Sequence, residues 1–221
     1  MKKWLLPLSV LALSGCELLP LNETELPPVS DTQLAWARHQ QQLSGLEAWT
    51  LDGRMSITKD EEAWHVSIKW QQIDTVFNIQ MFGPFGSGAL TLDGTPASVV
   101  LTIDGQRIES DDADALLANQ TGFDIPVNGL RYWAVGLAAP DLPSTNKLDN
   151  QGRLQQLEQA GWRVRYRGYQ QNNNGFILPS KVFLNNPELD VRMVIHNWDT
   201  VGQASLTQTS APKKRRPGYI R

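Results

Sequence analysis

Apolar and polar residues alternate along three neighbouring stretches of the chain, residues 48–58, 64–70 and 77–81. A period of two is typical of β-strands that bury one face and expose the other to water. The segments between the stretches are short, so we expect the strands to pair as antiparallel hairpins. Their apolar face comprises Trp49, Leu51, Gly53, Met55, Ile57, Trp64, Val66, Ile68, Trp70, Phe77, Ile79 and Met81.

The same alternation indicates further strands on either side of a central segment. Asp93-Gly94 and Asp104-Gly105 are strong turn signals between strands. The predicted strands are 89–92, 98–103 and 106–109 before the central segment, and 153–159, 162–169, 177–184 and 191–198 after it.

The central segment has the pattern of two helices. Residues 111–119 start with acidic side chains, which suit the first turn of a helix, and Gly122 follows just beyond. Pro126 suits the first turn of a second helix, predicted over residues 126–137. The apolar stripe of this second helix consists of Leu130, Trp133, Ala134 and Leu137.

One more helix is predicted ahead of the strands. Ser30 or Asp31 can cap its start, and Gly45 ends it after about Leu43. About ten strands with two helices in their middle predict a mainly β protein of the α+β kind. The pattern favours a strongly curved antiparallel sheet with helices on its concave face, because a closed barrel or a sandwich needs no central helices.

The N-terminus carries the pattern of a lipoprotein signal peptide. Lys2 and Lys3 precede an apolar run that is too short to span a bilayer. The run ends in Leu13-Ser14-Gly15-Cys16, which matches a bacterial lipobox, so we expect residues 1–15 to be removed and Cys16 to carry lipid. An ordinary signal peptide with a chance cysteine is the alternative. The small residues before Cys16, the only cysteine of the chain, disfavour it.

Composition divides the rest of the chain into three parts. Residues 16–29 contain three prolines and are predicted to form a flexible tether. Residues 30–199 form the predicted domain. Residues 200–221 are polar and then basic, and we expect them to be disordered. The residue after the lipidated cysteine is Glu17 rather than an aspartate, which favours sorting to the outer membrane.

Charge is unevenly distributed along the chain. The formal net charge is −3, and it becomes −5 once the two lysines of the signal peptide are removed. Residues 199–221 carry a net charge of +4, so the body of the chain is near −9. An acidic body argues against nucleic acid as a partner.

The residues that an enzyme or a metal site needs are not arranged in a recognisable way. His39, His65 and His196 have no ligand spacing to other metal-binding side chains. The glycine-rich stretch 83–88 lies between two strands and lacks the lysine of a phosphate-binding loop. The acidic residues of segment 111–119 are explained by the start of a helix. We therefore expect no catalytic residue, no metal and no cofactor.

Aromatic residues point to two features of the predicted sheet. Eight tryptophans are many for this length, and most fall in predicted strands or helices. They can fill a core or line an apolar cavity, and alternation alone does not distinguish the two. In the turn Gly83-Pro84-Phe85-Gly86, Phe85 either folds back into the core or is held out towards a membrane or a partner.

Several segments, taken in order, resemble the LolB family of outer-membrane lipoprotein receptors. The similarity runs from Cys16 to about Trp198, and the ordered set is more specific than any single piece. The matching segments are the lipobox, residues 36–42, 69–72, 83–87, 111–136, 147–149, 161–162, 168–169 and 197–198. The basic tail exceeds the family pattern.

This resemblance implies an unclosed antiparallel half-barrel with a helical lid over a hydrophobic cavity. It implies that the chain accepts lipoproteins from a LolA-type periplasmic carrier, holds their acyl chains and inserts them into the inner leaflet of the outer membrane. The protein would be a lipid-anchored monomer on the periplasmic face, with the carrier, acylated cargo and outer-membrane phospholipid as partners. In the family the protruding loop has a leucine at its tip, and Phe85 occupies that place here.

The resemblance and the alternation together assign candidate site residues. A general lipid-binding lipoprotein and a structural envelope lipoprotein with a filled core are the alternatives. The candidates are Cys16 for lipidation and Gly83, Pro84, Phe85 and Gly86 for the insertion loop. The candidate cavity wall is Trp49, Met55, Trp64, Val66, Ile68, Phe77, Ile79 and Met81, and the candidate lid is Leu130, Trp133 and Leu137.

Overall fold

The computed structural model describes residues 27–46, 48–84, 88–95, 97–140 and 142–201. The expected signal peptide, Cys16 and most of the expected tether lie outside these ranges, as does the tail from residue 202. The division of the chain at residues 15, 29 and 199 therefore stays a prediction.

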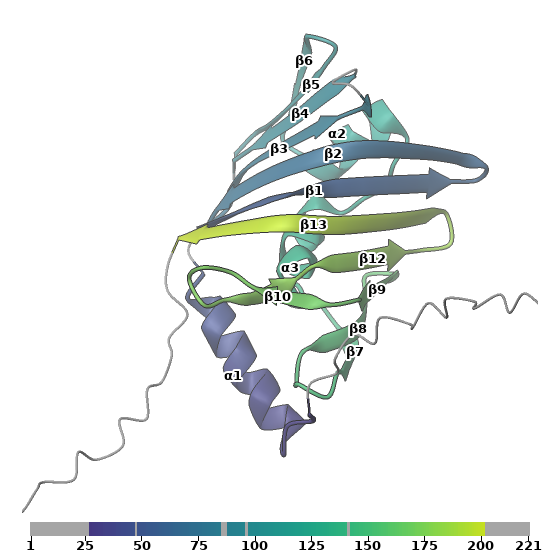
Figure 1. The fold of residues 1–221 in the computed structure, drawn as a ribbon. Coiled ribbons are helices and arrows are strands. Elements are labelled where there is room, and N and C mark those ends of the chain that lie inside the picture. Colours follow the sequence, from purple (N-terminus) through teal and green to yellow (C-terminus); the bar gives the residue numbers. More distant parts are fainter. Residues whose placement is uncertain (1–26, 47, 85–87, 96, 141, 202–221) are drawn as a thin grey trace, which may run out of the picture.

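Eleven strands form one antiparallel sheet that curves strongly around two helices (Figure 1). The strand order is β6-β5-β4-β3-β2-β1-β13-β12-β9-β8-β7. The first and last strands along the chain thus meet in the middle, and among the described residues no pairing joins the two edges, β6 and β7. The strands are β1 (Ala48–Lys59), β2 (Glu62–Ile73), β3 (Val76–Phe82), β4 (Ala89–Gly94), β5 (Val99–Ile103), β6 (Gln106–Ser110), β7 (Ser144–Leu148), β8 (Leu154–Gln159), β9 (Trp162–Tyr166), β12 (Lys181–Asn185) and β13 (Leu189–Val201).

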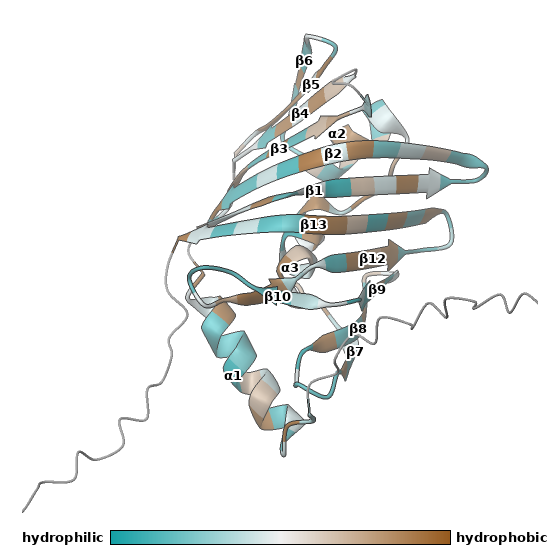
Figure 2. Cartoon of the chain, viewed as in Figure 1, coloured by the Kyte–Doolittle hydropathy of each residue, from teal (hydrophilic) through white to brown (hydrophobic). Residues whose placement is uncertain are grey.

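The cross-strand register gathers the apolar positions on the concave face. Met55 of β1 lies opposite Val66 of β2 on one side and Met193 of β13 on the other. Burial alternates along β1 as the sequence predicts, and apolar and polar residues alternate along the long central strands (Figure 2). The predicted hairpins and the predicted curved, unclosed antiparallel sheet are confirmed.

Two of the three helices in the described ranges cover the concave face, and the first lies to one end of it (Figure 1). The carboxylate of Asp31 caps the first helix by accepting hydrogen bonds from the amides of Gln33 and Leu34, both 3.0 Å long. Helix formation ends at Gly45 and Gly122 as the sequence predicts, whereas the second central helix ends at Gly136, short of the predicted residue 137. The helices are α1 (Thr32–Ser44), α2 (Ala113–Thr121) and α3 (Val127–Val135).

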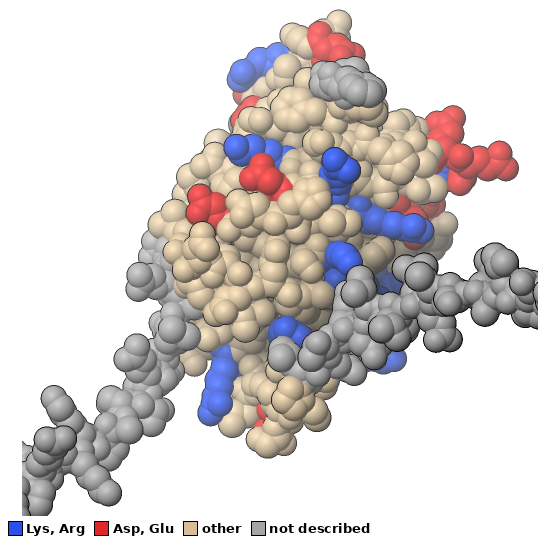
Figure 3. Space-filling view, in the orientation of Figure 1, with Lys and Arg blue, Asp and Glu red and all other residues tan. Residues whose placement is uncertain are grey.

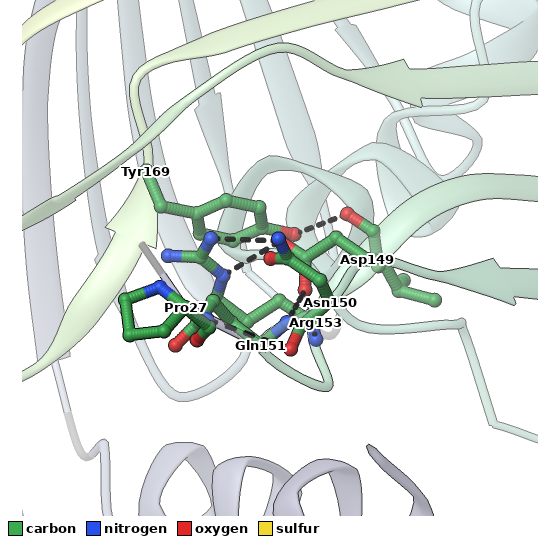
Figure 4. Close-up of polar contacts among 7 residues, drawn as sticks. Pro27, Asp149, Asn150, Gln151, Arg153 and Tyr169 are labelled. Carbon is green, nitrogen blue, oxygen red and sulfur yellow. Dashed lines mark hydrogen bonds and ion pairs between the residues drawn. The ribbon is translucent and has the colours of Figure 1, made fainter. Parts of the chain in front are cut away.

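The turn between β7 and β8 holds the start of the described chain against the domain (Figure 4). The side-chain amide of Gln151 donates a 2.6 Å hydrogen bond to the carbonyl oxygen of Pro27. The amide of Val29 donates a 2.8 Å hydrogen bond to the carbonyl oxygen of Asn150. The last residues of the expected tether are therefore bound to the turn and do not extend freely into solvent.

Several other sequence expectations about local structure are wrong. Strand β7 was not predicted, because its residues are mostly polar and exposed. The strands predicted over 162–169 and 177–184 are each interrupted, since β10 (Tyr169–Gln171) and β11 (Ile177–Pro179) leave the large sheet and pair with each other. Pro179 has no amide hydrogen to continue a ladder. Pro126 precedes α3 as its N-cap instead of lying in its first turn.

Candidate functional site

An apolar cavity of about 370 Å³ lies between the concave face of the sheet and the two central helices. It extends across β1 to β5, β12 and β13 on one side and from α2 to α3 on the other. Its apolar lining consists of Met55, Ile57, Trp64, Val66, Ile68, Trp70, Ile79, Met81, Ala89, Leu90, Leu92, Ile103, Leu117, Phe123, Ile125, Val127, Leu130, Trp133, Trp162, Leu184, Val191 and Met193. The interior is thus not filled at this place, and the alternative of a wholly filled core is wrong.

The sheet side of the cavity follows directly from strand register. Ile68 of β2 lies opposite Met81 of β3, which in turn lies opposite Leu90 of β4. Leu90 lies opposite Ile103 of β5. Because side chains on one face of a sheet repeat every second residue, these four form one continuous apolar row under the lid.

Buried hydrogen bonds fix the lid to the sheet. Trp133 of α3 donates from its indole Nε1 to Oε1 of Gln159 over 2.9 Å, and its carbonyl oxygen accepts a 3.0 Å hydrogen bond from the hydroxyl of Tyr166. Within the lid, the carboxylate of Asp114 in α2 accepts a 2.8 Å hydrogen bond from the amide of Val127. Burial raises the pKa of Asp114, and the Val127 amide opposes this shift. α2 and α3 are therefore held as one unit against the sheet.

Contacts between β2 and the lid close one end of the cavity. The rings of Trp64 and Phe123 meet edge to face with centroids 4.9 Å apart, although Trp64 remains 38% exposed. Close to this pair, the ammonium group of Lys59 donates a 2.9 Å hydrogen bond to the carbonyl oxygen of Gly122 at the end of α2. This edge of the lid is held by a ring pair and an exposed hydrogen bond, whereas α3 is held to the sheet by buried hydrogen bonds.

Eight of the predicted wall and lid residues line this cavity, namely Met55, Trp64, Val66, Ile68, Ile79, Met81, Leu130 and Trp133. The other three lie elsewhere. Trp49 packs against Trp70 and Trp198 with ring centroids 5.0 and 5.5 Å away. The ring of Phe77 covers Gly94 on the neighbouring strand. Leu137 lies beyond the end of α3, near Trp49. A role in binding acyl chains stays a prediction for all eleven.

Several cavity residues were not singled out by the sequence. They are contributed by β4, β5, β12, β13 and the segment between the two central helices, and include Leu90, Leu92, Ile103, Phe123, Leu184, Val191 and Met193. The strand residues stand on the apolar face of strands that the alternation did predict. Assigning every second residue of those strands to the same inward face would have identified these cavity residues.

The β3–β4 connection stands at the rim of the cavity. Gly88 and Ala89, at the start of β4, line the cavity. At the other end of the connection, after β3, Gly83 is half-buried and Pro84 is exposed. The predicted insertion residues Phe85 and Gly86 lie outside the described residues, as does Cys16, so their roles stay predictions.

The cavity lining contains few groups that could perform chemistry. Its polar side chains are those of Asp104, Gln120 and Thr121. In the part of the chain that the structure describes, no three His, Cys, Asp or Glu side chains are grouped so that they could hold a metal ion. None of the described helices is long and apolar enough to cross a membrane. The arrangement is suited to enclosing an apolar ligand.

Comparison with known proteins places the chain in a family. A family model described as "Outer membrane lipoprotein LolB" matches residues 47–198. A protein named outer-membrane lipoprotein LolB from Nitrosococcus oceani is 39% identical over 193 residues, which cover 86% of this chain and 94% of the relative. A protein of the same name from Stutzerimonas stutzeri is 36% identical and covers 90% of this chain and 95% of the relative. One from Pseudomonas aeruginosa is 39% identical and covers 84% and 90%.

Solved structures with the same fold are far more distant in sequence. A putative outer membrane lipoprotein-sorting protein domain from Vibrio parahaemolyticus superposes with a TM-score of 0.51 at 7% identity, covering 82% of this chain and 95% of that one. A LolA superfamily protein from Nitrosomonas europaea superposes with a TM-score of 0.50 at 8% identity, covering 77% and 94%. At these identities the similarity establishes the fold alone.

Proposed function

Because this chain belongs to the LolB family of outer-membrane lipoproteins, we propose that its apolar cavity binds the acyl chains of lipoprotein cargo. Membership of the family makes the chain a lipoprotein-trafficking factor of the outer membrane, with a LolA-type interaction in general, and not an enzyme. The particular residues that bind acyl chains, the contact with phospholipid and the monomeric state belong to this proposal.

The physical need for such a cavity follows from the cargo. Burying one methylene group is worth about 0.8 kcal/mol. A lipoprotein with three acyl chains carries roughly 40 methylene groups, so exposing them to water costs on the order of 30 kcal/mol. Cargo therefore has to pass from one apolar environment directly into another.

The observation that carries the proposal is an apolar cavity that reaches Gly88, the last residue before β4. The lining is apolar apart from three side chains, and Gly88 and Ala89 lie at its edge. No nucleotide site is recognisable in the sequence, so transfer is expected to run by differences in affinity between carrier, cavity and membrane.

Delivery requires the cavity to be kept at the membrane. Lipid on Cys16 would anchor the protein to the periplasmic face of the outer membrane, and Phe85 would enter the phospholipid of the inner leaflet first. A large apolar side chain is well suited to this step, since burying it in a bilayer releases about 1.5–3 kcal/mol. We expect the protein to act as a monomer, because one enclosed cavity needs no second copy.

Full loading of the cavity requires the lid to move. Small-ligand sites span ~300–1,000 Å³, and the present cavity of about 370 Å³ lies near the lower end. As acyl chains enter, we expect α2 and α3 to move away from β2. This movement would open the contact between Trp64 and Phe123 at the exposed edge of the lid.

The proposal is tested by placing one charge in the cavity. In the variant Val66→Glu, a carboxylate faces the apolar lining, and we expect the affinity for a fluorescent fatty acid to fall by about tenfold or more. Ala63→Glu is the matched control, because Ala63 is exposed on the same strand and does not line the cavity. If the parent chain and both variants bind the fatty acid with equal affinity, the cavity is not the site that binds acyl chains.

A second measurement identifies the cargo. A lipoprotein carrying a photoreactive acyl chain should crosslink to the cavity after handover from a LolA-type carrier, and should not do so in Val66→Glu. Crosslinking of free phospholipid with no crosslinking of lipoprotein would instead support a general lipid-binding protein.

A further inference from the structure

The convex face of the sheet carries a band of basic side chains across its middle strands. Arg54 of β1 and Lys181 of β12 both lie opposite Val194 of β13 in the strand register. In the adjacent row, Phe183 of β12 lies between two more cations, one on β13 and one on β9. Arg167 follows β9, is exposed, and donates a 2.9 Å hydrogen bond from its amide to the carbonyl oxygen of Lys181. We call Arg54, Lys181, Arg167, Arg192 and Arg165 the basic band. Lys and Arg side chains gather over these strands on the face shown in Figure 3.

Little negative charge compensates the basic band. Arg192 Nε forms a 2.9 Å ion pair with Asp190, and both side chains are largely exposed. Within the described ranges, the other four cations of the band form no ion pair. The buried Nε of Arg165 has no hydrogen-bond partner there either. A positive face of this kind attracts anionic groups by its electrostatic potential.

A groove of about 880 Å³ lies where the basic band meets the β3–β4 connection. Ser67 of β2 lies opposite both Arg54 and Phe82, so the row of the band continues directly to the last residue of β3. The groove thereby combines cations, hydroxyl groups and apolar surface. Its lining includes Arg54, Ser56, His65, Ser67, Phe82, Gly83, Pro84, Phe183, Arg192 and Val194.

We propose that this groove binds the headgroup of an anionic phospholipid in the bilayer to which the protein is anchored. Guanidinium groups donate paired hydrogen bonds to phosphate oxygens, and serine hydroxyls can donate to the remaining ones. Phe82 and Phe183 offer apolar contact for the glycerol backbone and the first methylene groups of a lipid. The inference rests on the proposed function, since it takes the bilayer as the place of delivery.

The groove and the cavity lie at opposite ends of the β3–β4 connection. Gly83 and Pro84 line the groove, whereas Gly88 and Ala89 line the cavity. A headgroup bound in the groove therefore places the cavity rim beside the bilayer. An acidic protein surface is the competing partner. The apolar surface beside the cations and the permanent proximity of a membrane favour lipid.

The test measures binding of the full chain to lipid vesicles without its own anchor. Every protein is the chain from residue 16 onwards, as cleavage at the lipobox would leave it. It carries Cys16→Ala and the tail changes Lys213→Gln, Lys214→Gln, Arg215→Gln and Arg216→Gln, so that the signal segment, the lipid and the basic tail do not contribute to binding. Sedimentation with vesicles of phosphatidylcholine and phosphatidylglycerol gives the affinity. Adding Arg54→Gln and Arg192→Gln should weaken binding by about tenfold or more, since each cation at an anionic surface contributes a factor of about five.

A matched control removes the same charge elsewhere. Arg107→Gln with Arg163→Gln takes two cations from strands of the same sheet that do not line the groove, and we expect a change of less than about twofold. If both pairs weaken vesicle binding equally, the effect is one of net charge and the inference is overturned. It is also overturned if Arg54→Gln with Arg192→Gln does not weaken vesicle binding. Displacement from vesicles by inorganic phosphate at matched ionic strength would make the groove a free anion site and also overturn it.

Two further measurements separate this inference from the proposed function and from a protein partner. Fatty-acid binding without vesicle binding would overturn the headgroup groove alone, and vesicle binding without fatty-acid binding would overturn the acyl-chain cavity alone. If the groove pair abolishes crosslinking to the periplasmic carrier and leaves vesicle binding intact, the groove belongs to an acidic protein and the lipid assignment is wrong.

Discussion

The indole Nε1 of Trp133 in the lid helix α3 donates a 2.9 Å hydrogen bond to Oε1 of Gln159 in the sheet, and both side chains are buried. The same oxygen accepts a 2.8 Å hydrogen bond from the amide of Ala139. The side-chain amide nitrogen of Gln159 donates to the carbonyl oxygens of Ala139 and Leu142. One buried side chain therefore fixes both the lid helix and the segment that follows it.

Replacing Gln159 with leucine should loosen the lid. The indole of Trp133 and the backbone of Ala139 would be left buried without partners, at about 1–3 kcal/mol for each group. We expect the free energy of unfolding, measured by chemical denaturation, to fall by about 3 kcal/mol. Gln155→Leu is the control, since Gln155 is exposed on the same strand and should change stability by less than ~0.5 kcal/mol. Equal stabilities of the two variants would contradict this role.

His39 of α1 makes stability depend on pH. Burial lowers its pKa to about 4, assisted by the positive charge of Arg153 and opposed by Asp149. Its Nε2 is buried without a hydrogen-bond partner among the described residues. In the unfolded chain the pKa is about 6.5, so only the unfolded state takes up this proton as the pH falls from about 6.5 to about 4. Stability is therefore lost across that window.

The expected loss between pH 7 and pH 5 from His39 alone is about 2 kcal/mol in the free energy of unfolding. His39→Leu should remove that part of the pH dependence and leave the rest. The measurement is urea unfolding of the parent and the variant at both pH values. His196→Leu, at an exposed position, should retain the pH dependence of the parent. If His39→Leu also retains it in full, another group is responsible.

Gly152 lies at a close contact between the β7–β8 turn and α1. Its φ is +71°, and a Cβ there would lie 2.5 Å from the Cβ of Ala35 and 2.7 Å from the carbonyl oxygen of Thr32. Gly161 has a similar φ of +79°, but a Cβ there would meet no described atom within 4 Å beyond the glycine and its two chain neighbours. Gly152→Ala should therefore lower the free energy of unfolding by about 2 kcal/mol more than Gly161→Ala. If the two variants lose similar free energies of unfolding, α1 shifts to accommodate the added methyl group at no cost in stability.

Phe85→Glu should separate the two steps of cargo handling. A carboxylate cannot enter the hydrocarbon region cheaply, so we expect insertion of lipoprotein into vesicles to fall by about tenfold or more. Acceptance of cargo from the carrier should change by less than about twofold, because it depends on the cavity. Phe85→Leu restores the residue of the family pattern and should insert as well as the parent. Normal insertion by Phe85→Glu would remove Phe85 from the mechanism.

Local sequence patterns predicted most of the sheet because they depend on neighbouring residues only. The alternation from Trp49 to Met81 marks one face of β1, β2 and β3, and that face either is buried or lines the cavity. It failed at β7, which carries mostly polar residues at a sheet edge. It also failed at Pro179, where the local pairing of β10 with β11 ends before β12 joins the large sheet, because alternation does not show which strands pair and proline has no amide hydrogen for a ladder.

The sequence by itself determined which side chains face inwards, since the two-residue period of a strand and the 3.6-residue period of a helix are local properties. Only the tertiary structure decided where the inward face is packed and where it encloses space. Trp49 and Met55 share one face of one strand, yet Trp49 is packed among tryptophans and Met55 lines the cavity. A cavity exists where two packed surfaces do not meet. That separation depends on how deeply α2 and α3 dock, which long-range contacts such as the one between Trp133 and Gln159 establish.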